Sequence, residues 1–327
     1  MCVFCNQRSI SGKQSFRRES VIEEIEEALA TISPESEVEI AYFGGSFTGI
    51  DRELMIYLLD VAASYVNREE DGRARVTGIR MSTRPDYIND EIMDILSRYP
   101  VKTVELGLQS MDDEVLKKTN RGHTSHDAEI ACKMIVDAGY SLVGQMMIGL
   151  PASTLQKEIY TAEKICDMGA QAARIYPTVT FFDTELACMA ERGEYEMLSL
   201  DDAIYRSKEV LKVFERREVD CIRIGLCASD NLGDLTKVMG GANHAALGEL
   251  VMGELYFDKI CAIADRLQGE KGSLEGRTLE ISVPQGQTSQ AIGQNRKNKI
   301  RLVERYGLKN IIIKENNLSG LEIAVTG

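Results

Sequence analysis

Strand-like and helix-like hydrophobic patterns alternate along most of the chain. Short apolar runs such as VTGIRMS and AARIYP predict buried strands, and segments with apolar residues every three or four positions predict helices between them. Six strands are expected at 37–43, 76–82, 101–110, 141–151, 172–177 and 220–226, with helices at 20–32, 52–66, 89–99, 127–139, 154–169 and 200–216. Apolar strands that alternate with helices form a parallel sheet covered by helices, so the pattern predicts an α/β fold.

Polar and glycine-containing motifs follow the expected strands. They read GGS (44–46), STRPD (82–86), GLQS (107–110) and GLP (149–151). In α/β barrels the active site is built at the edge where the strands end. The sequence therefore predicts a partial, TIM-like barrel with its functional site at this edge.

The composition is that of an ordinary globular protein, with 44% hydrophobic and 27% charged residues. A formal net charge of −13 argues against general adhesion to nucleic acid or anionic membranes. No apolar run approaches the ~20 residues that span a bilayer, and we expect a cytoplasmic protein. In a reducing cytosol the eight cysteines would not form disulfides. Six scattered ones are expected to be small buried hydrophobes: Cys132, Cys166, Cys188, Cys221, Cys227 and Cys261.

The charge balance changes near residue 270. Residues 1–269 hold 29 Lys and Arg against 45 Asp and Glu, whereas residues 270–327 hold 9 against 6. The tail also has its own β-α-β pattern, with strands at 278–284 and 310–315, a helix around 289–306 and a short strand at 321–325. We therefore predict two domains, a barrel over 1–269 and a small α+β module over 270–327.

Two cysteines, Cys2 and Cys5, open the chain in the stretch MCVFCNQRSISGK. Two thiolates at this spacing bind zinc, bind an iron–sulfur cluster or cycle as a dithiol. A zinc site normally needs a second pair of Cys or His ligands, and a redox-active cysteine pair normally follows a strand. The spacing alone does not decide between these chemistries.

The surrounding motifs carry more information. CVFCNQRSISGK, YFGGSFTGI, STRPDYI, LGLQSMDDEVLKKTNRGHT, MMIGLP and RIYPTV, in this order over residues 1–250, resemble the radical S-adenosylmethionine (SAM) superfamily. The branch that contains the Elongator catalytic subunit is the most similar. The resemblance implies a partial (β/α)6 barrel, a 4Fe–4S cluster, SAM and an external electron donor such as flavodoxin or ferredoxin. It also implies an enzyme that generates a 5′-deoxyadenosyl radical.

The resemblance assigns Cys2 and Cys5 as cluster ligands. Relatives carry a third cysteine four residues before the position of Cys2, which falls upstream of Met1. We expect an N-terminal truncation that removes this ligand and the first barrel strand. A non-catalytic, RNA- or partner-binding remnant is the alternative. The chain also ends before an acetyltransferase domain of the Elongator type would begin.

The resemblance further implies a set of cofactor-binding residues. Phe4 would lie beside the cluster and the adenine, and the GGS motif would hold the methionyl amine. Ser82 and Gln145 stand where cousins carry ribose-facing acids, and Arg121 suits the cofactor carboxylate. The full set is Phe4, Gly44, Gly45, Ser46, Ser82, Gln109, Arg121, Gln145 and Gly149. No catalytic residue is assigned.

The segment SQAIGQNRKNKIRLVERYG (289–307) resembles the loop and helix of a KH-type RNA-binding module, with Arg296 in place of the second glycine. Six basic residues follow Ile292, against the single acidic residue Glu304: Arg296, Lys297, Lys299, Arg301, Arg305 and Lys309. Clustered positive charge on an acidic protein predicts a contact with an RNA phosphate backbone through 289–309, with a solvated helix face as the alternative. Together with the Elongator-like motifs this points to a tRNA uridine.

Overall fold

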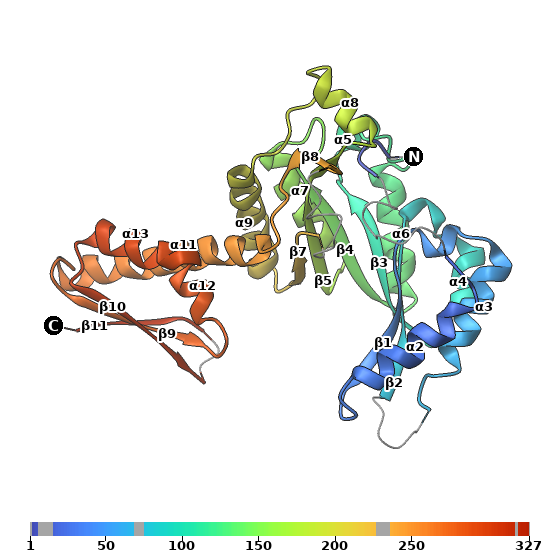
Figure 1. Cartoon of the computed structure of the whole chain (residues 1–327), viewed down its shortest axis with the longest axis horizontal. Coiled ribbons are helices and arrows are strands. Elements are labelled where there is room, and N and C mark those ends of the chain that lie inside the picture. Colours follow the sequence, from blue (N-terminus) through green and yellow to red (C-terminus); the bar gives the residue numbers. More distant parts are fainter. Residues whose placement is uncertain (1, 6–15, 69–74, 227–235, 318–319, 327) are drawn as a thin grey trace.

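A computed structural model describes residues 2–5, 16–68, 75–226, 236–317 and 320–326. Its centre is a six-stranded sheet in the order β1-β2-β3-β4-β5-β7, in which every neighbouring pair is parallel (Figure 1). The strands are β1 (Glu37–Tyr42), β2 (Arg75–Thr83), β3 (Val101–Gln109), β4 (Ser141–Ile148), β5 (Ala172–Pro177) and β7 (Asp220–Ile224). The predicted partial barrel and its six strands are confirmed.

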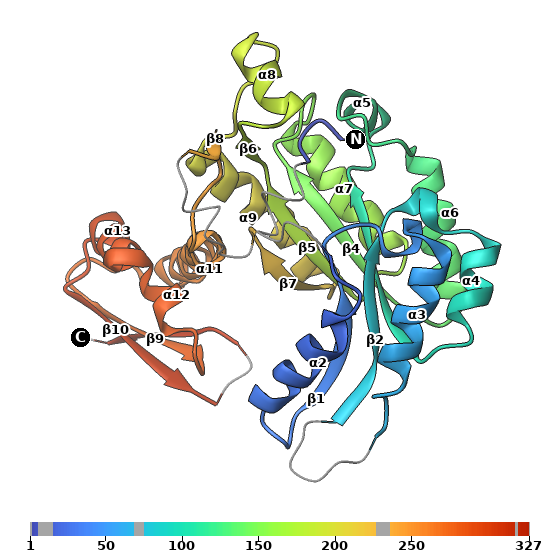
Figure 2. The same ribbon diagram turned by 45° about the vertical axis from the view of Figure 1, so that its right-hand side comes forward.

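Helices cover one face of this sheet. They are α2 (Ser20–Thr31), α3 (Arg52–Ala63), α4 (Asp90–Leu96), α6 (Ser125–Asp137), α7 (Leu155–Asp167) and α9 (Leu200–Arg216). Two further helices, α5 (Asp113–Lys118) and α8 (Glu185–Glu191), lie beyond the strand ends at the top of Figure 1, and short 3-10 turns are η1 (Phe47–Gly49) and η2 (Pro85–Tyr87). Side chains alternate between the two faces of a strand. Ile79, Leu106, Met146 and Ile175 point into the main hydrophobic core beneath the helices. Their neighbours along each strand point to the opposite face, which we call the inner face of the curled sheet (Figure 2).

Local capping fixes where several helices begin after the strand-end motifs. Asn89 accepts from the backbone N–H of Ile92, and Asp112 accepts from Val115, each at 3.0 Å. Thr124 and Asp127 form a reciprocal capping box at the start of α6. These caps define the first residues of α4, α5 and α6.

A long helix, α11 (Leu247–Lys271), was not predicted from the sequence. It connects the barrel to the C-terminal module in Figure 1. Leu247 and Val251 belong to the barrel core, whereas Phe257 and Ile260 belong to a second core. Its apolar residues therefore lie on more than one side, which obscures the single stripe by which helices are recognised. The helix runs through the predicted domain boundary at 269/270, and that boundary stays a prediction. Among the described helices, none combines the length and apolarity needed to cross a membrane.

The C-terminal module packs on the far half of α11. It contains β9 (Thr278–Pro284), α12 (Thr288–Ile292), η3 (Gln294–Arg296), α13 (Lys297–Tyr306), β10 (Asn310–Asn316) and β11 (Glu322–Thr326). The sheet order is β10-β9-β11, with β10 parallel and β11 antiparallel to β9. The single helix predicted around 289–306 is wrong. Gly293, Asn295 and Arg296 have φ angles of 74°, 54° and 63°, which break it into two helices joined by a loop.

Two short strands, β6 (Val179–Phe181) and β8 (Val238–Gly241), form a separate antiparallel pair beside the main sheet. The scattered cysteines were predicted only in part. Cys132 and Cys261 are buried, but Cys166 and Cys221 are half-buried and Cys188 is exposed. Cys188 is exposed because α8 buries the two preceding residues and turns the next position outward. Cys227 lies outside the described residues.

Candidate cofactor site

The two N-terminal cysteines lie in a turn at the edge where the strands end. The Cys5 N–H donates to the Cys2 carbonyl at 3.2 Å. Val3 ties this turn to two helices, because its N–H donates to Thr119 at 3.1 Å and its carbonyl accepts from Leu186 at 2.8 Å. The N-terminus accordingly lies beside α5 in both views (Figures 1 and 2). Cys2 is buried, and Cys5 and Phe4 are half-buried.

A buried arginine joins the cysteine turn to the sheet. Nη1 of Arg121 donates to the Cys2 sulfur at 3.3 Å, and Nη2 donates to the Gly107 carbonyl at 2.5 Å. A cation in this position favours negative charge on a cluster-bound sulfur. Gly107 was missed in the sequence. A Cβ there would lie 2.7 Å from Nη2 of Arg121, so a larger residue would displace the guanidinium.

The ends of β1 and β2 meet at the GGS motif. The Ser82 hydroxyl donates to the Gly45 carbonyl at 3.3 Å, and Ser46 begins the turn η1. Gly44 has a φ of 103°, which favours glycine. A Cβ at Gly45 would meet no atom of the described residues within 4 Å, apart from its neighbours in the chain. The backbone at Gly45 is thus open to close approach by a ligand.

Two glutamines lie further along this edge. Gln109 ends β3 with a φ of 67°, and its buried Oε1 has no hydrogen-bond partner among the described residues. Gln145 is half-buried on β4 and pairs in register with Gly107. A buried acceptor without a partner is costly, so Gln109 is suited to receive a hydrogen bond from a polar ligand such as a ribose hydroxyl.

The peptide of Gly149 is held from both sides. Its N–H donates to the Glu158 carboxylate at 2.7 Å, and its carbonyl accepts from the Tyr195 hydroxyl at 2.8 Å. Glu158 in turn pairs with Arg206 through contacts of 2.7 and 2.5 Å. Burial raises the pKa of the Glu158 carboxyl, and Arg206 opposes that shift. Glu158 could not be singled out as a site residue from the sequence, because it is one of several charged residues of α7.

His123 is buried behind the Arg121 segment. Burial, with a contribution from the Arg121 charge, lowers the pKa of His123 to about 4. Neither ring nitrogen has a hydrogen-bond partner in the part of the chain that the structure describes. The imidazole is therefore neutral at pH 7.

The described residues supply two sulfur ligands and no more. Within the described ranges, no group of three or more His, Cys, Asp and Glu side chains is arranged to hold a metal ion. Cys2 and Cys5 fit two positions of an iron–sulfur cluster, with Arg121 beside one of them.

Charged residues on the inner face form a second feature that the strand predictions did not assign. We call Arg80, Glu105 and Arg174 the Arg–Glu row. Glu105 is 1% exposed, and its carboxylate lies 2.9 Å from Nε of Arg80 and 2.8 Å from Nε of Arg174. The sequence contained an indication of this feature, because each of these charged residues lies directly beside apolar residues within a strand.

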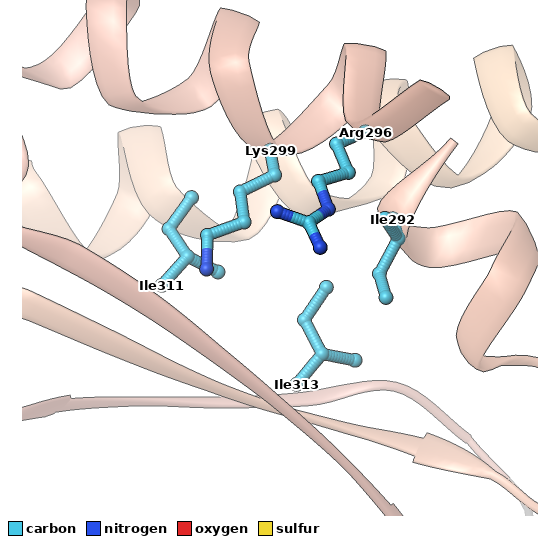
Figure 3. Close-up of a pocket in the computed structure, with 5 residues that line it drawn as sticks. All are labelled: Ile292, Arg296, Lys299, Ile311 and Ile313. Atoms are coloured by element: carbon cyan, nitrogen blue, oxygen red, sulfur yellow. The ribbon is translucent and has the colours of Figure 1, made fainter. Parts of the chain in front are cut away.

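The C-terminal module contains a pocket of about 300 Å³ between α13 and β10. Figure 3 shows the side chains of Arg296 and Lys299 above an apolar floor, and the lining residues are Ile292, Arg296, Lys299, Ile311 and Ile313.

Other basic residues of α13 are engaged elsewhere. Lys297 and Arg301 pair with Glu254 of α11 at 3.1 and 2.8 Å, and Arg305 lies 3.4 Å from Asp265. Of the six basic residues predicted to face RNA, three thus serve the contact with α11.

A half-barrel with a CxxC turn at the carboxyl edge of its strands is the architecture of radical SAM enzymes. The family model described as the radical SAM superfamily matches residues 1–165, and that of the radical SAM C-terminal domain matches residues 170–256. The chain belongs to the radical SAM superfamily. Enzymes of this superfamily use a 4Fe–4S cluster and SAM, which confirms the predicted cofactors.

Several similar proteins are of the Elongator type. A tRNA uridine(34) acetyltransferase from Methanocaldococcus infernus is 26% identical, over 67% of this chain and 42% of its own length. Elongator complex protein 3 from Schizosaccharomyces pombe is 29% identical, over 49% of this chain and 32% of its own. The structure of archaeal Elp3 from M. infernus with an N-terminal deletion shares the fold, with a TM-score of 0.60, 23% identity and coverage of 79% of this chain and 63% of that one. The chain spans roughly two fifths of the first of these relatives.

Proposed function

We propose that this protein is a radical SAM enzyme that modifies RNA, with tRNA as the substrate class. The observation that carries the cofactor part is the continuous contact from Cys2 through Arg121 to Gly107. It joins the cysteine turn to the edge of the sheet where Gly45, Ser82 and Gln109 lie.

In this proposal the chain's own residues bind and orient the cofactor. The backbone at Gly44 and Gly45 holds the methionyl amine, and Ser46 begins the turn that fixes it. Gln109, Gln145 and Ser82 hold the ribose, while Gly149 and Phe4 contact the adenine. When bound, the cluster and SAM supply one-electron chemistry that removes a hydrogen atom from the substrate. A small electron-transfer protein, flavodoxin or ferredoxin, is the proposed reductant.

The contacts of Arg121 change the role that the resemblance implied for this residue. Both ends of its guanidinium already have partners, the Cys2 sulfur and the Gly107 carbonyl. We assign it to the cluster side of the site, where it stabilises the sulfur ligand and borders the cofactor carboxylate.

The RNA part rests on two observations. Arg296 and Lys299 line a pocket with an isoleucine floor, which suits a nucleotide with its phosphate on the cations. The similar archaeal protein is named for a tRNA uridine. The RNA-binding surface that we propose is thus this pocket, and it comprises fewer residues than the whole basic segment 289–309.

Anaerobic reconstitution with iron and sulfide, followed by incubation with SAM, dithionite and tRNA, tests the proposal. We expect 5′-deoxyadenosine to form and the tRNA to change in mass. A reconstituted protein that binds SAM but leaves every tRNA unchanged would contradict the RNA part alone.

A second candidate is an RNA-binding protein without a working cluster. It is favoured by the two-sulfur ligand set of the described residues. In the same experiment this candidate retains tRNA on the protein, while iron stays at background and no 5′-deoxyadenosine appears.

A further inference from the structure

The inner face of the sheet carries an aromatic ring that no cofactor assignment uses. Phe43 follows β1 directly and is 52% exposed. Its ring centroid lies 5.5 Å from the guanidinium carbon of Arg174 on β5. In the sheet order, β2, β3 and β4 separate these two strands. Strands are about 4.8 Å apart, so the two would be about 19 Å apart in a flat sheet. The contact therefore reaches across the concave side of the curled sheet.

The Arg–Glu row holds this arginine beside a buried carboxylate. Nη2 of Arg174 donates to Glu105 at 3.0 Å, and Nε lies 2.8 Å from the same carboxylate as an ion pair without a hydrogen bond of its own. Nε of Arg80 lies 2.9 Å from Oε1 of the same carboxylate. Glu105 is fully buried, whereas the side chains of Arg80 and Arg174 remain 25% and 15% exposed. The donors of the row therefore stay partly accessible on the inner face.

The position of Phe43 relates this platform to the cofactor site. The next residue is Gly44, at the start of the motif to which we assign the methionyl amine. The residues assigned to the adenine, Phe4 and Gly149, belong to other segments, with Gly149 following β4. A molecule on Phe43 would thus lie next to bound SAM without competing for the adenine position.

We infer that Phe43 and Arg174 receive the target nucleobase, a carbonyl-bearing base taken out of its stack. This inference rests on the proposed function, because it names the contacts of the RNA substrate. A half-exposed phenylalanine offers a flat face for stacking, and a fixed guanidinium offers N–H donors to ring carbonyls. Enzymes that act on a base read it in this way once it is extruded.

The test uses the full 327-residue chain after anaerobic reconstitution, with binding and not turnover as the readout. The probes are a short RNA hairpin with one uridine in its loop and the same hairpin with an abasic loop position. Fluorescence anisotropy gives the dissociation constant for each. We expect the parent to prefer the uridine hairpin by about tenfold, the order of one base–aromatic stack.

Phe43→Ala should abolish the preference and Phe43→Tyr should retain it. Arg174→Lys, which keeps the charge but loses the planar fork, should reduce it. Phe182→Ala is the matched control, because Phe182 is 46% exposed and follows β6. Since Phe43 is half-exposed, its variants should melt like the parent.

The outcomes separate the two claims. A parent that binds both hairpins equally, or a Phe43→Ala variant that keeps the preference, overturns this inference and leaves the proposed function standing. A parent that binds neither hairpin nor tRNA overturns both.

Discussion

The inner face of the sheet and the pocket of the C-terminal module both present arginines, but they hold them differently. On the inner face, Arg121 and Arg174 are fixed by partners of the barrel itself, the Gly107 carbonyl and the buried Glu105. In the module, Arg296 and Lys299 line an open pocket. Fixed cations in a buried setting give orientation, whereas cations in an open pocket give affinity that depends on salt. The difference assigns cofactor and base positioning to the barrel and backbone contact to the module.

The largest expected effect is on the cysteine turn of the barrel. Cys2→Ser and Cys5→Ser each remove a sulfur ligand, so iron retained after reconstitution and desalting should fall to background. Cys188→Ser, at an exposed position on α8, should retain as much iron as the parent. Iron analysis per chain is the measurement. A serine variant at position 2 or 5 with the parent's iron content would show that the cluster is not held there.

The next effect concerns the Arg–Glu row. Glu105→Gln removes the buried carboxylate between Arg80 and Arg174 and leaves Arg80 with Glu39 at 3.4 Å, and the free energy of unfolding should fall by about 3 kcal/mol. Urea denaturation measures it. The matched control is Glu37→Gln on β1, whose pair with Arg75 is more than half exposed and should contribute no more than about 1 kcal/mol. Equal losses in the two variants would mean that the row is not a fixed, buried element.

A pH dependence should distinguish the barrel from the module. The pKa of His123 is about 4 in the folded protein against an ordinary value of 6.5, so the unfolded chain binds more protons between these values. Stability that is present above pH 6.5 is therefore lost as the pH falls toward 4, by at most about 3 kcal/mol. His123→Gln should flatten this profile. Residues 270–327 contain no histidine, so no imidazole of the module contributes to this profile. A variant with the parent's slope from pH 6.5 to 4 would contradict the assignment.

The smallest effect is on the module. Arg296→Gln with Lys299→Gln should weaken tRNA binding about tenfold and flatten its salt dependence by about 1.5 in the log–log slope, for two lost phosphate contacts. Lys297→Gln with Arg305→Gln removes the same charge from the same helix and is the control. These two residues pair with Glu254 and Asp265, so their loss should change the salt slope little. If both double variants behave alike in a salt titration, net charge and not the pocket governs binding.

The sequence was sufficient for the main sheet because its strands are continuous apolar runs that end in glycine or polar motifs. It was insufficient for α11, which is apolar on more than one side because it serves two cores. The left-handed residues Asn295 and Arg296 were also hidden, since neither residue type requires that conformation. Both facts show that tertiary packing can override the local pattern.

The candidate site was predictable to a similar extent. Motif resemblance located the strand-end residues, including Gly45 and Gln109, at one edge. It did not reveal Gly107, whose lack of a side chain makes room for Arg121, or Tyr195, which reaches Gly149 from a distant loop. Such contacts depend on the folded path of the chain and leave no spacing signal.

Calorimetric titration of SAM into the reconstituted parent and into Gly45→Val tests the central claim most directly. Among the described residues a Cβ at Gly45 meets only its chain neighbours within 4 Å, so the variant should keep the parent's melting temperature. The valine would obstruct the backbone that we assign to the methionyl amine. We predict that the parent binds SAM and that the folded variant loses at least tenfold in affinity, or about 1.4 kcal/mol. Equal binding by the two proteins would contradict the assignment of the cofactor to this edge of the barrel.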